Sequence, residues 1–125
     1  MNVVRVAGVA GALAAALAVG LGAFGAHALR ATLGPDDLAV WRTAVDYQFW
    51  HALGLLVVAL VAQRSPSTLR VTTIAFIGGI VLFCASLYAL ALGAPRALGM
   101  LTPVGGVAFI VGWMSLAMAL LRPRH

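Results

Sequence analysis

Charged side chains are scarce in this chain. Of its 125 residues, 9% are charged, against about a quarter in an ordinary soluble domain. Lysine and glutamate are missing, so the charges come from eight arginines and three aspartates. Hydrophobic residues make up 63% of the chain, and the mean hydropathy is +1.07. A water-facing surface cannot be built from this composition, which predicts an integral membrane protein with one compact domain.

The basic residues are scattered and not clustered. Proteins that bind nucleic acid gather basic residues on one face, whereas basic residues between apolar runs are typical of membrane flanks. We therefore exclude nucleic acid as a partner, despite the net charge of +5, and expect the lipid bilayer instead. The basic residues are Arg5, Arg30, Arg42, Arg64, Arg70, Arg96, Arg122 and Arg124.

Potential metal ligands and thiols are few. Cys84 is the single cysteine, so the chain cannot form an intrachain disulfide, and its place inside an apolar run favours a small packing residue. His27 and His51 have no second carboxylate or thiolate near them in the expected bundle. The segment Gly20–Gly25 fits G-x-G-x-x-G, but that fingerprint requires a preceding strand. We expect no metal and no cofactor.

Four long uncharged runs dominate the sequence. They predict an all-α, integral membrane four-helix bundle with up-down connectivity. Pro35 suits the first position of a helix, and Asp36 and Asp37 suit its positive end, so a short interfacial helical segment is expected before the second span. The expected spans are 6–27, 44–62, 71–93 and 102–121.

The first run is expected to stay in the mature protein. Its uncharged stretch of roughly 21 residues exceeds the ~7–15 residues of a signal-peptide core. Four spans place both termini on one side, with Arg5, Arg64, Arg70, Arg122 and Arg124. The other side holds Arg30, Arg42, Arg96 and all three aspartates. The excess of arginine predicts that both termini are cytoplasmic.

Unusual polar residues are expected to meet at the outer face of the bundle. A titratable side chain in hydrocarbon is costly, so it marks a candidate functional site. Up-down connectivity brings the end of the first span, the start of the second, the end of the third and the start of the fourth to this face. The candidate cluster is His27, Arg42, Asp46, Tyr47, Gln48, His51, Tyr88 and Thr102.

Helical spacing predicts specific pairs within the second span. Arg42 and Asp46 are four residues apart and are expected to form an ion pair. Tyr47 and His51 have the same spacing and are expected to form a hydrogen bond. Asp46 and His51 point about 140° apart, so they are not a direct couple. Two interpretations stay open for these polar groups, a hydrogen-bond network between helices and a site for a ligand or proton.

Several segments together resemble a known family. They are Gly22–Leu29, Trp41 through Tyr47-Gln48 to His51-Ala52-Leu53, Phe83 through Ser86-Leu87-Tyr88, and Thr102-Pro103-Val104-Gly105-Gly106 with Gly112-Trp113. In these segments the chain is similar to small bacterial inner-membrane proteins classed as domain of unknown function 423, also called uncharacterised protein family 0382. The resemblance implies about four membrane helices and a relation to eukaryotic transmembrane protein 256, but no catalytic residue and no activity.

A non-enzymatic role is the preferred interpretation. We expect a multi-pass protein of the bacterial inner membrane whose outer polar cluster contacts a partner helix, a lipid headgroup or a small ligand. The expected partners of the chain as a whole are the lipid bilayer and either a second copy in a homo-oligomer or a partner membrane protein. The alternative is a small oligomeric transporter or channel that uses Asp46 and His51. No nucleophile or metal set supports catalysis.

Overall fold

The computed structural model describes residues 1–123, which form four helical rods and no strand. The rods are α1 Val3–His27, α2 Pro35–Ala62, a third rod built from α3 Arg70–Gly79, one π-helical turn Ile80–Cys84 and α4 Ala85–Ala91, and α5 Leu101–Leu121. Short 3₁₀ turns occupy Leu29–Ala31, Pro66–Leu69 and Arg96–Met100. Arg124, one of the arginines counted for the orientation, lies outside the described residues.

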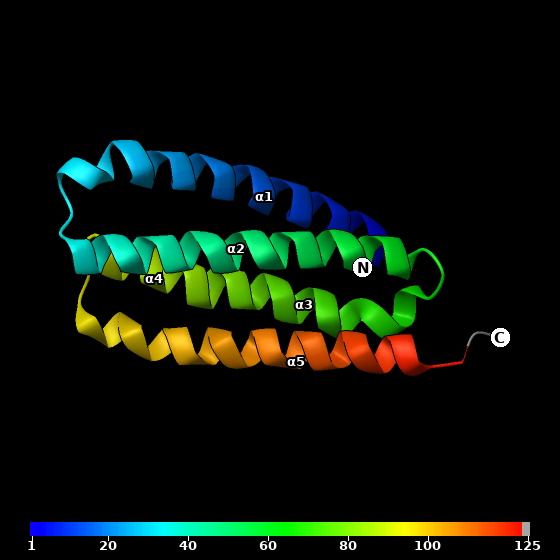
Figure 1. Ribbon diagram of the computed structural model, residues 1–125. Coiled ribbons are helices and arrows are strands. Elements are labelled where there is room, and N and C mark those ends of the chain that lie inside the picture. Colours follow the sequence, from blue (N-terminus) through cyan, green and yellow to red (C-terminus); the bar gives the residue numbers. More distant parts are fainter. Residues whose placement is uncertain (124–125) are drawn as a thin grey trace.

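Consecutive rods run in opposite directions, so the beginning of α1 and the end of α5 lie at the same end of the bundle (Figure 1). α1 packs along α2, the third rod packs on α2, and α5 lies against the third rod. All four rods are long and apolar enough to cross a membrane. The expected all-α fold with four membrane helices is confirmed.

The second rod is one continuous helix of 28 residues. Pro35 occupies its first turn after the N-cap Gly34, and Asp36 and Asp37 follow it at the positive end of the helix. At 1.5 Å per residue α2 is ~42 Å long, which exceeds a ~30 Å hydrocarbon core. Its opening turns therefore extend beyond the hydrocarbon without a break from the rest of the helix.

Glycines allow aromatic rings to lie directly against neighbouring helices. A Cβ atom added to Gly25 would lie 2.6 Å from the indole of Trp41, and one added to Gly112 would collide with Phe76. A Cβ atom on Gly105 would overlap the backbone nitrogen of Phe83. This agrees with the close approach that small residues permit between membrane helices. Gly25 of the G-x-G-x-x-G segment is one of these packing glycines.

The π-helical turn lies where α5 approaches the third rod. Its wider hydrogen bonding is visible at Ala85, whose N–H donates to the Ile80 carbonyl five residues earlier. Phe83, within this turn, contacts Gly105 through its backbone, and its ring lies 4.5 Å from the ring of Tyr47 on α2. The turn thus brings the third rod into contact with both α2 and α5.

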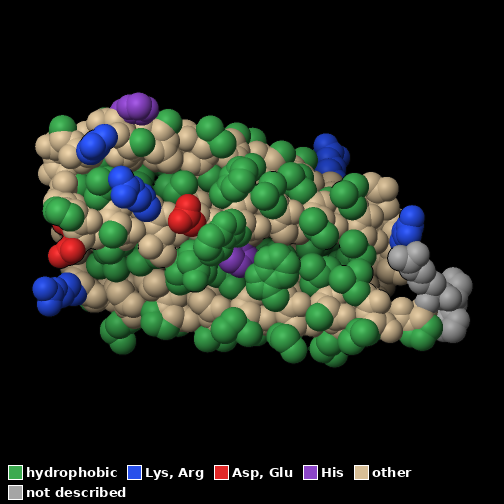
Figure 2. All heavy atoms as spheres, in the orientation of Figure 1, with side chains coloured by type: hydrophobic (Ala, Val, Ile, Leu, Met, Phe, Trp, Pro, Cys, Tyr) green, Lys and Arg blue, Asp and Glu red, His purple; other side chains and the backbone are tan. Residues whose placement is uncertain are grey.

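Charged side chains on the face drawn in Figure 2 gather toward the two ends of the bundle, with apolar side chains between them. One acidic and one basic group stand further in from the end, on the surface. This distribution fits a molecule whose middle lies in hydrocarbon.

Candidate functional site

The structure divides the eight candidate residues into two groups. His27, Arg42 and Asp46 have exposed side chains. Gln48 and His51 are each only 4% exposed. The other three, Tyr47, Tyr88 and Thr102, are half-buried. The expected single cluster is therefore resolved into an interior set of hydrogen bonds between helices and a separate surface set on α1 and α2.

Gln48 connects three helices. Its Nε2 donates to the carbonyl oxygen of Ala14 on α1 at 2.9 Å, and its Oε1 accepts from the hydroxyl of Tyr88 on α4 at 2.7 Å. Since a carbonyl can only accept, the amide of Gln48 has one orientation. Tyr88 also packs against Trp41, with ring centroids 4.7 Å apart, and Trp41 donates from Nε1 to the carbonyl of Leu21 at 2.9 Å.

His51 connects α2 to α5. Its Nε2 accepts from Nε1 of Trp113 at 3.0 Å, and its Nδ1 lies 2.7 Å from the carbonyl oxygen of Tyr47. The ring stacks on Phe109, with centroids 3.5 Å apart and an interplanar angle of 13°. Because an indole N–H only donates, Nε2 must be unprotonated and Nδ1 must carry the proton. The His51 ring is therefore neutral, and each of its two nitrogens takes part in a hydrogen bond.

Thr102 takes part in a third contact. Its hydroxyl lies 2.6 Å from that of Ser86, which also donates to the Phe83 carbonyl at the π-helical turn. Toward the opposite end of the bundle, Thr72 donates to Ser115 at 2.9 Å. Both hydroxyl pairs join the third rod to α5.

The two side-chain pairs expected on α2 are not found. Arg42 and Asp46 form no ion pair, which fits the weaker interaction of a helical pair whose basic residue precedes the acidic one. His51 bonds the backbone carbonyl of Tyr47 and not its hydroxyl, and the two rings stack 6.0 Å apart. A histidine reaches the carbonyl four residues back more directly than it reaches a phenol across a full turn.

Sequence reasoning missed the two tryptophan donors. Trp41 and Trp113 each supply an indole N–H to an acceptor on another helix. The available signal was that a tryptophan inside an apolar span needs a partner for its N–H. Within residues 1–123, every buried side-chain nitrogen or oxygen has a hydrogen-bond partner. The fully buried side-chain atoms of the interior set are therefore all hydrogen-bonded, which favours a role in holding the helices together.

Two residues of the surface set, Arg42 and Asp46, lie on the outward face of α2, whereas His27 lies at the end of α1. The exposed residues of this face of α2 recur at spacings of four, four, three and four, the pattern of a helix face that packs against another helix. Trp50, Leu53 and Val57 have exposed fractions of 54%, 44% and 47%. We call this face the α2 stripe, and it consists of Arg42, Asp46, Trp50, Leu53 and Val57.

Comparison with known proteins gives consistent results. The family described as "Protein of unknown function (DUF423)" matches residues 21–106. The UPF0382 membrane protein YwdK of Bacillus subtilis is 47% identical over 90% of this chain and 93% of its own length. The UPF0382 membrane protein SERP0230 of Staphylococcus epidermidis is 46% identical over 90% of this chain and 92% of its own.

A third relative is also similar over most of both chains. The UPF0382 membrane protein SAB0533 of Staphylococcus aureus is 41% identical over 87% of this chain and 89% of its own length. No solved structure matches the chain. With a match over most of its length and bacterial membrane proteins among its relatives, this chain belongs to the DUF423 family of membrane proteins, whose function is uncharacterised.

Proposed function

We propose that this protein is a non-catalytic membrane subunit that binds a second copy of itself through the α2 stripe, with both termini on the cytoplasmic side of a bacterial inner membrane. The observation that carries the proposal is Asp46, a carboxylate exposed on the surface of a membrane span with no ion pair among residues 1–123. An ionisable side chain at such a place is costly unless a partner covers it.

The depth of Asp46 follows from helix geometry. If the end of α2 at Ala62 lies at one boundary of the hydrocarbon, Asp46 lies ~24 Å along the helix and Arg42 ~30 Å along it. In a core ~30 Å thick, Arg42 is then at the opposite boundary and Asp46 about 6 Å inside it. Arg42 reaches water with its long side chain, whereas the short Asp46 side chain does not.

A second copy supplies the missing charge. In a two-fold dimer the same patch meets itself, so a residue that contacts another across the axis is contacted by it in return. When two α2 helices pack in parallel, Asp46 of each copy lies one turn from Arg42 of the other. Two reciprocal ion pairs result, and both are shielded from lipid by the Trp50 side chains one turn further in.

The rest of the α2 stripe fits the same partner. Spacings of three and four along one helix suit a packing angle of about 20°, which is common among membrane helices. Trp50, Leu53 and Val57 are exposed and apolar along the stripe. Arg42 and Asp46 would then determine the register of the two α2 helices, and the apolar residues of the α2 stripe would supply the packing area between them.

Transport through Asp46 and His51 has weaker support. Asp46 is exposed on the outward face of α2, whereas His51 is buried between α2 and α5 with both ring nitrogens in hydrogen bonds. A proton relay needs groups that share a path and exchange partners. The two residues do not face one another across such a path.

Disulfide cross-linking in native membranes tests the proposal. Leu53→Cys and Val57→Cys are made separately in a Cys84→Ala background, because a disulfide requires Cα atoms within about 7 Å. We expect mild oxidation to give a covalent dimer of twice the chain mass at these positions. Leu17→Cys on α1 is the matched control and should stay monomeric, although Leu17, at 61%, is more exposed than Leu53 or Val57. Equal cross-linking at Leu17 and on the α2 stripe would contradict the proposal.

A further inference from the structure

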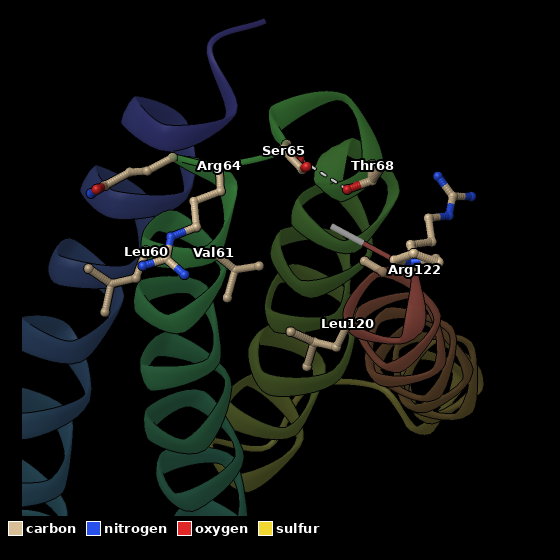
Figure 3. Close-up of a pocket in the computed structure, with 10 residues that line it drawn as sticks. Leu60, Val61, Arg64, Ser65, Thr68, Leu120 and Arg122 are labelled. Carbon is tan, nitrogen blue, oxygen red and sulfur yellow. Dashed lines mark hydrogen bonds between the residues drawn. The ribbon is translucent and has the colours of Figure 1, made fainter. Parts of the chain in front are cut away.

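A second surface site lies at the opposite end of the molecule from the charged part of the α2 stripe. A cavity of about 690 Å³ opens between the end of α2 and the end of α5. Its polar lining includes Arg64, Ser65 and Arg122, and its apolar lining includes Val61 and Leu120. Figure 3 shows Arg64 and Arg122 on opposite sides of this cavity, with Thr68 turned toward Ser65.

An apolar groove continues from this cavity along the third rod and α5. It has a volume of about 530 Å³, and it shares Thr68, Ala119 and Arg122 with the cavity. Further along, Met114 and Ile110 line it. From Arg122 to Ile110 the groove follows α5 for ~18 Å, slightly more than half of a ~30 Å hydrocarbon core. This length fits one acyl chain within one leaflet.

Among residues 1–123, the charged side chains at this end of the bundle are all basic. Four arginines of this part of the chain lie here, two of them on the cavity, and all three aspartates lie on α2 toward the other end. Neither Arg64 nor Arg122 forms an ion pair within the described part of the chain. Basic pockets between membrane helices are suited to anionic lipid headgroups, and arginine binds phosphate oxygens through several N–H groups at once. The four are Arg5, Arg64, Arg70 and Arg122.

We propose that this cavity and groove bind one anionic phospholipid, with its phosphate between Arg64 and Arg122 and one acyl chain along Met114 and Met118. Arg64 and Arg122 line the cavity from opposite sides, and their guanidinium groups, which point away from each other in Figure 3, turn toward the phosphate in the proposed complex. Ser65 lines the same cavity. The groove explains why the ligand is a lipid and not a free phosphate ion. The site uses no residue of the α2 stripe, so lipid binding can be tested separately from self-association.

Native mass spectrometry of the detergent-purified protein provides the test, with phosphatidylglycerol and phosphatidylcholine as probes. We expect phosphatidylglycerol to bind at least about tenfold more tightly than phosphatidylcholine. The double variant Arg64→Gln/Arg122→Gln should weaken phosphatidylglycerol binding by about tenfold, the loss of one charge-assisted contact or more. Its matched control, Arg30→Gln/Arg96→Gln, removes the same charge at the other end and should change binding by less than about twofold.

Two further measurements distinguish a bound lipid from a bound inorganic phosphate ion. Met118→Trp, which narrows the groove without changing charge, should also weaken phosphatidylglycerol binding, and millimolar inorganic phosphate should not displace the lipid. Circular dichroism verifies that each variant remains helical. Equal binding of the two lipids, equal loss in both double variants, or displacement of the lipid by inorganic phosphate would each overturn the proposal.

Discussion

Trp113 donates its indole N–H to Nε2 of His51 at 3.0 Å, which ties α5 to the only buried histidine of residues 1–123. This contact determines the proton position on the ring, because the other nitrogen then donates to the Tyr47 carbonyl. The histidine that sequence reasoning placed among functional candidates is thus a neutral cross-link, packed face to face on Phe109.

Trp113→Phe should destabilise the bundle by about 1 kcal/mol. The substitution keeps an aromatic side chain but leaves Nε2 of His51 without a donor, and hydrogen bonds between membrane helices are worth about 0.6 kcal/mol on average and up to about 1.7. Reversible unfolding in mixed micelles measures the change in free energy. Val107→Ala, a truncation at an exposed position of α5, should change it by less than about 0.5 kcal/mol. Equal effects would show that the contact contributes nothing specific.

Gln48 and Tyr88 should be energetically coupled. Gln48→Leu and Tyr88→Phe each remove one side of the 2.7 Å hydrogen bond, so the second substitution should cost less once the first is made. We expect a coupling energy of about 1 kcal/mol in a double-mutant cycle measured by the same unfolding assay. Strict additivity of the two single variants would contradict the account of Gln48 as the link between α1, α2 and α4.

Gly105→Ala should disrupt the contact between α5 and the third rod. The new Cβ would overlap the backbone nitrogen of Phe83, which cannot rotate away as a side chain could. We expect a loss of about 2–3 kcal/mol, as for other overpacked interiors. Gly20→Ala is the control, since nothing lies within 4 Å of its added Cβ. It should leave stability unchanged or raise it by up to about 1 kcal/mol. A neutral Gly105→Ala would contradict the close approach at the π-helical turn.

The sequence was sufficient to predict the helices and their alternating directions. Long uncharged runs bounded by arginine, and Pro35 followed by Asp36 and Asp37, are strong local signals. They do not report which side of a helix meets which neighbour. The π-helical turn at Ile80–Cys84 has no such signal, and it lies where the backbone of Phe83 meets Gly105 of a distant segment.

The candidate site could be predicted only as a list of residues. Up-down connectivity predicted that Gln48, Tyr88 and Thr102 lie near one end of the bundle. It did not predict the hydrogen-bond acceptors found there, because two of these acceptors are backbone carbonyls of α1 and the third rod. Backbone acceptors are present at every residue and leave no trace in a sequence. The separation of Asp46 from His51 was predictable from their angle on the helix, whereas the exposure of Asp46 depends on where α1 and the third rod pack against α2.

Reversal of the two charges on the α2 stripe tests self-association most directly. The protein is labelled with one dye per chain and placed at low density in lipid vesicles, where photobleaching steps count the copies. Asp46→Arg alone brings two guanidinium groups together across the interface, and Arg42→Asp alone brings two carboxylates together, so each single variant should bleach in one step. The double variant Arg42→Asp/Asp46→Arg restores opposite charges and should bleach in two steps, like the unchanged protein. Two-step bleaching in both single variants, or one-step bleaching in the double variant, would contradict a dimer built on Arg42 and Asp46.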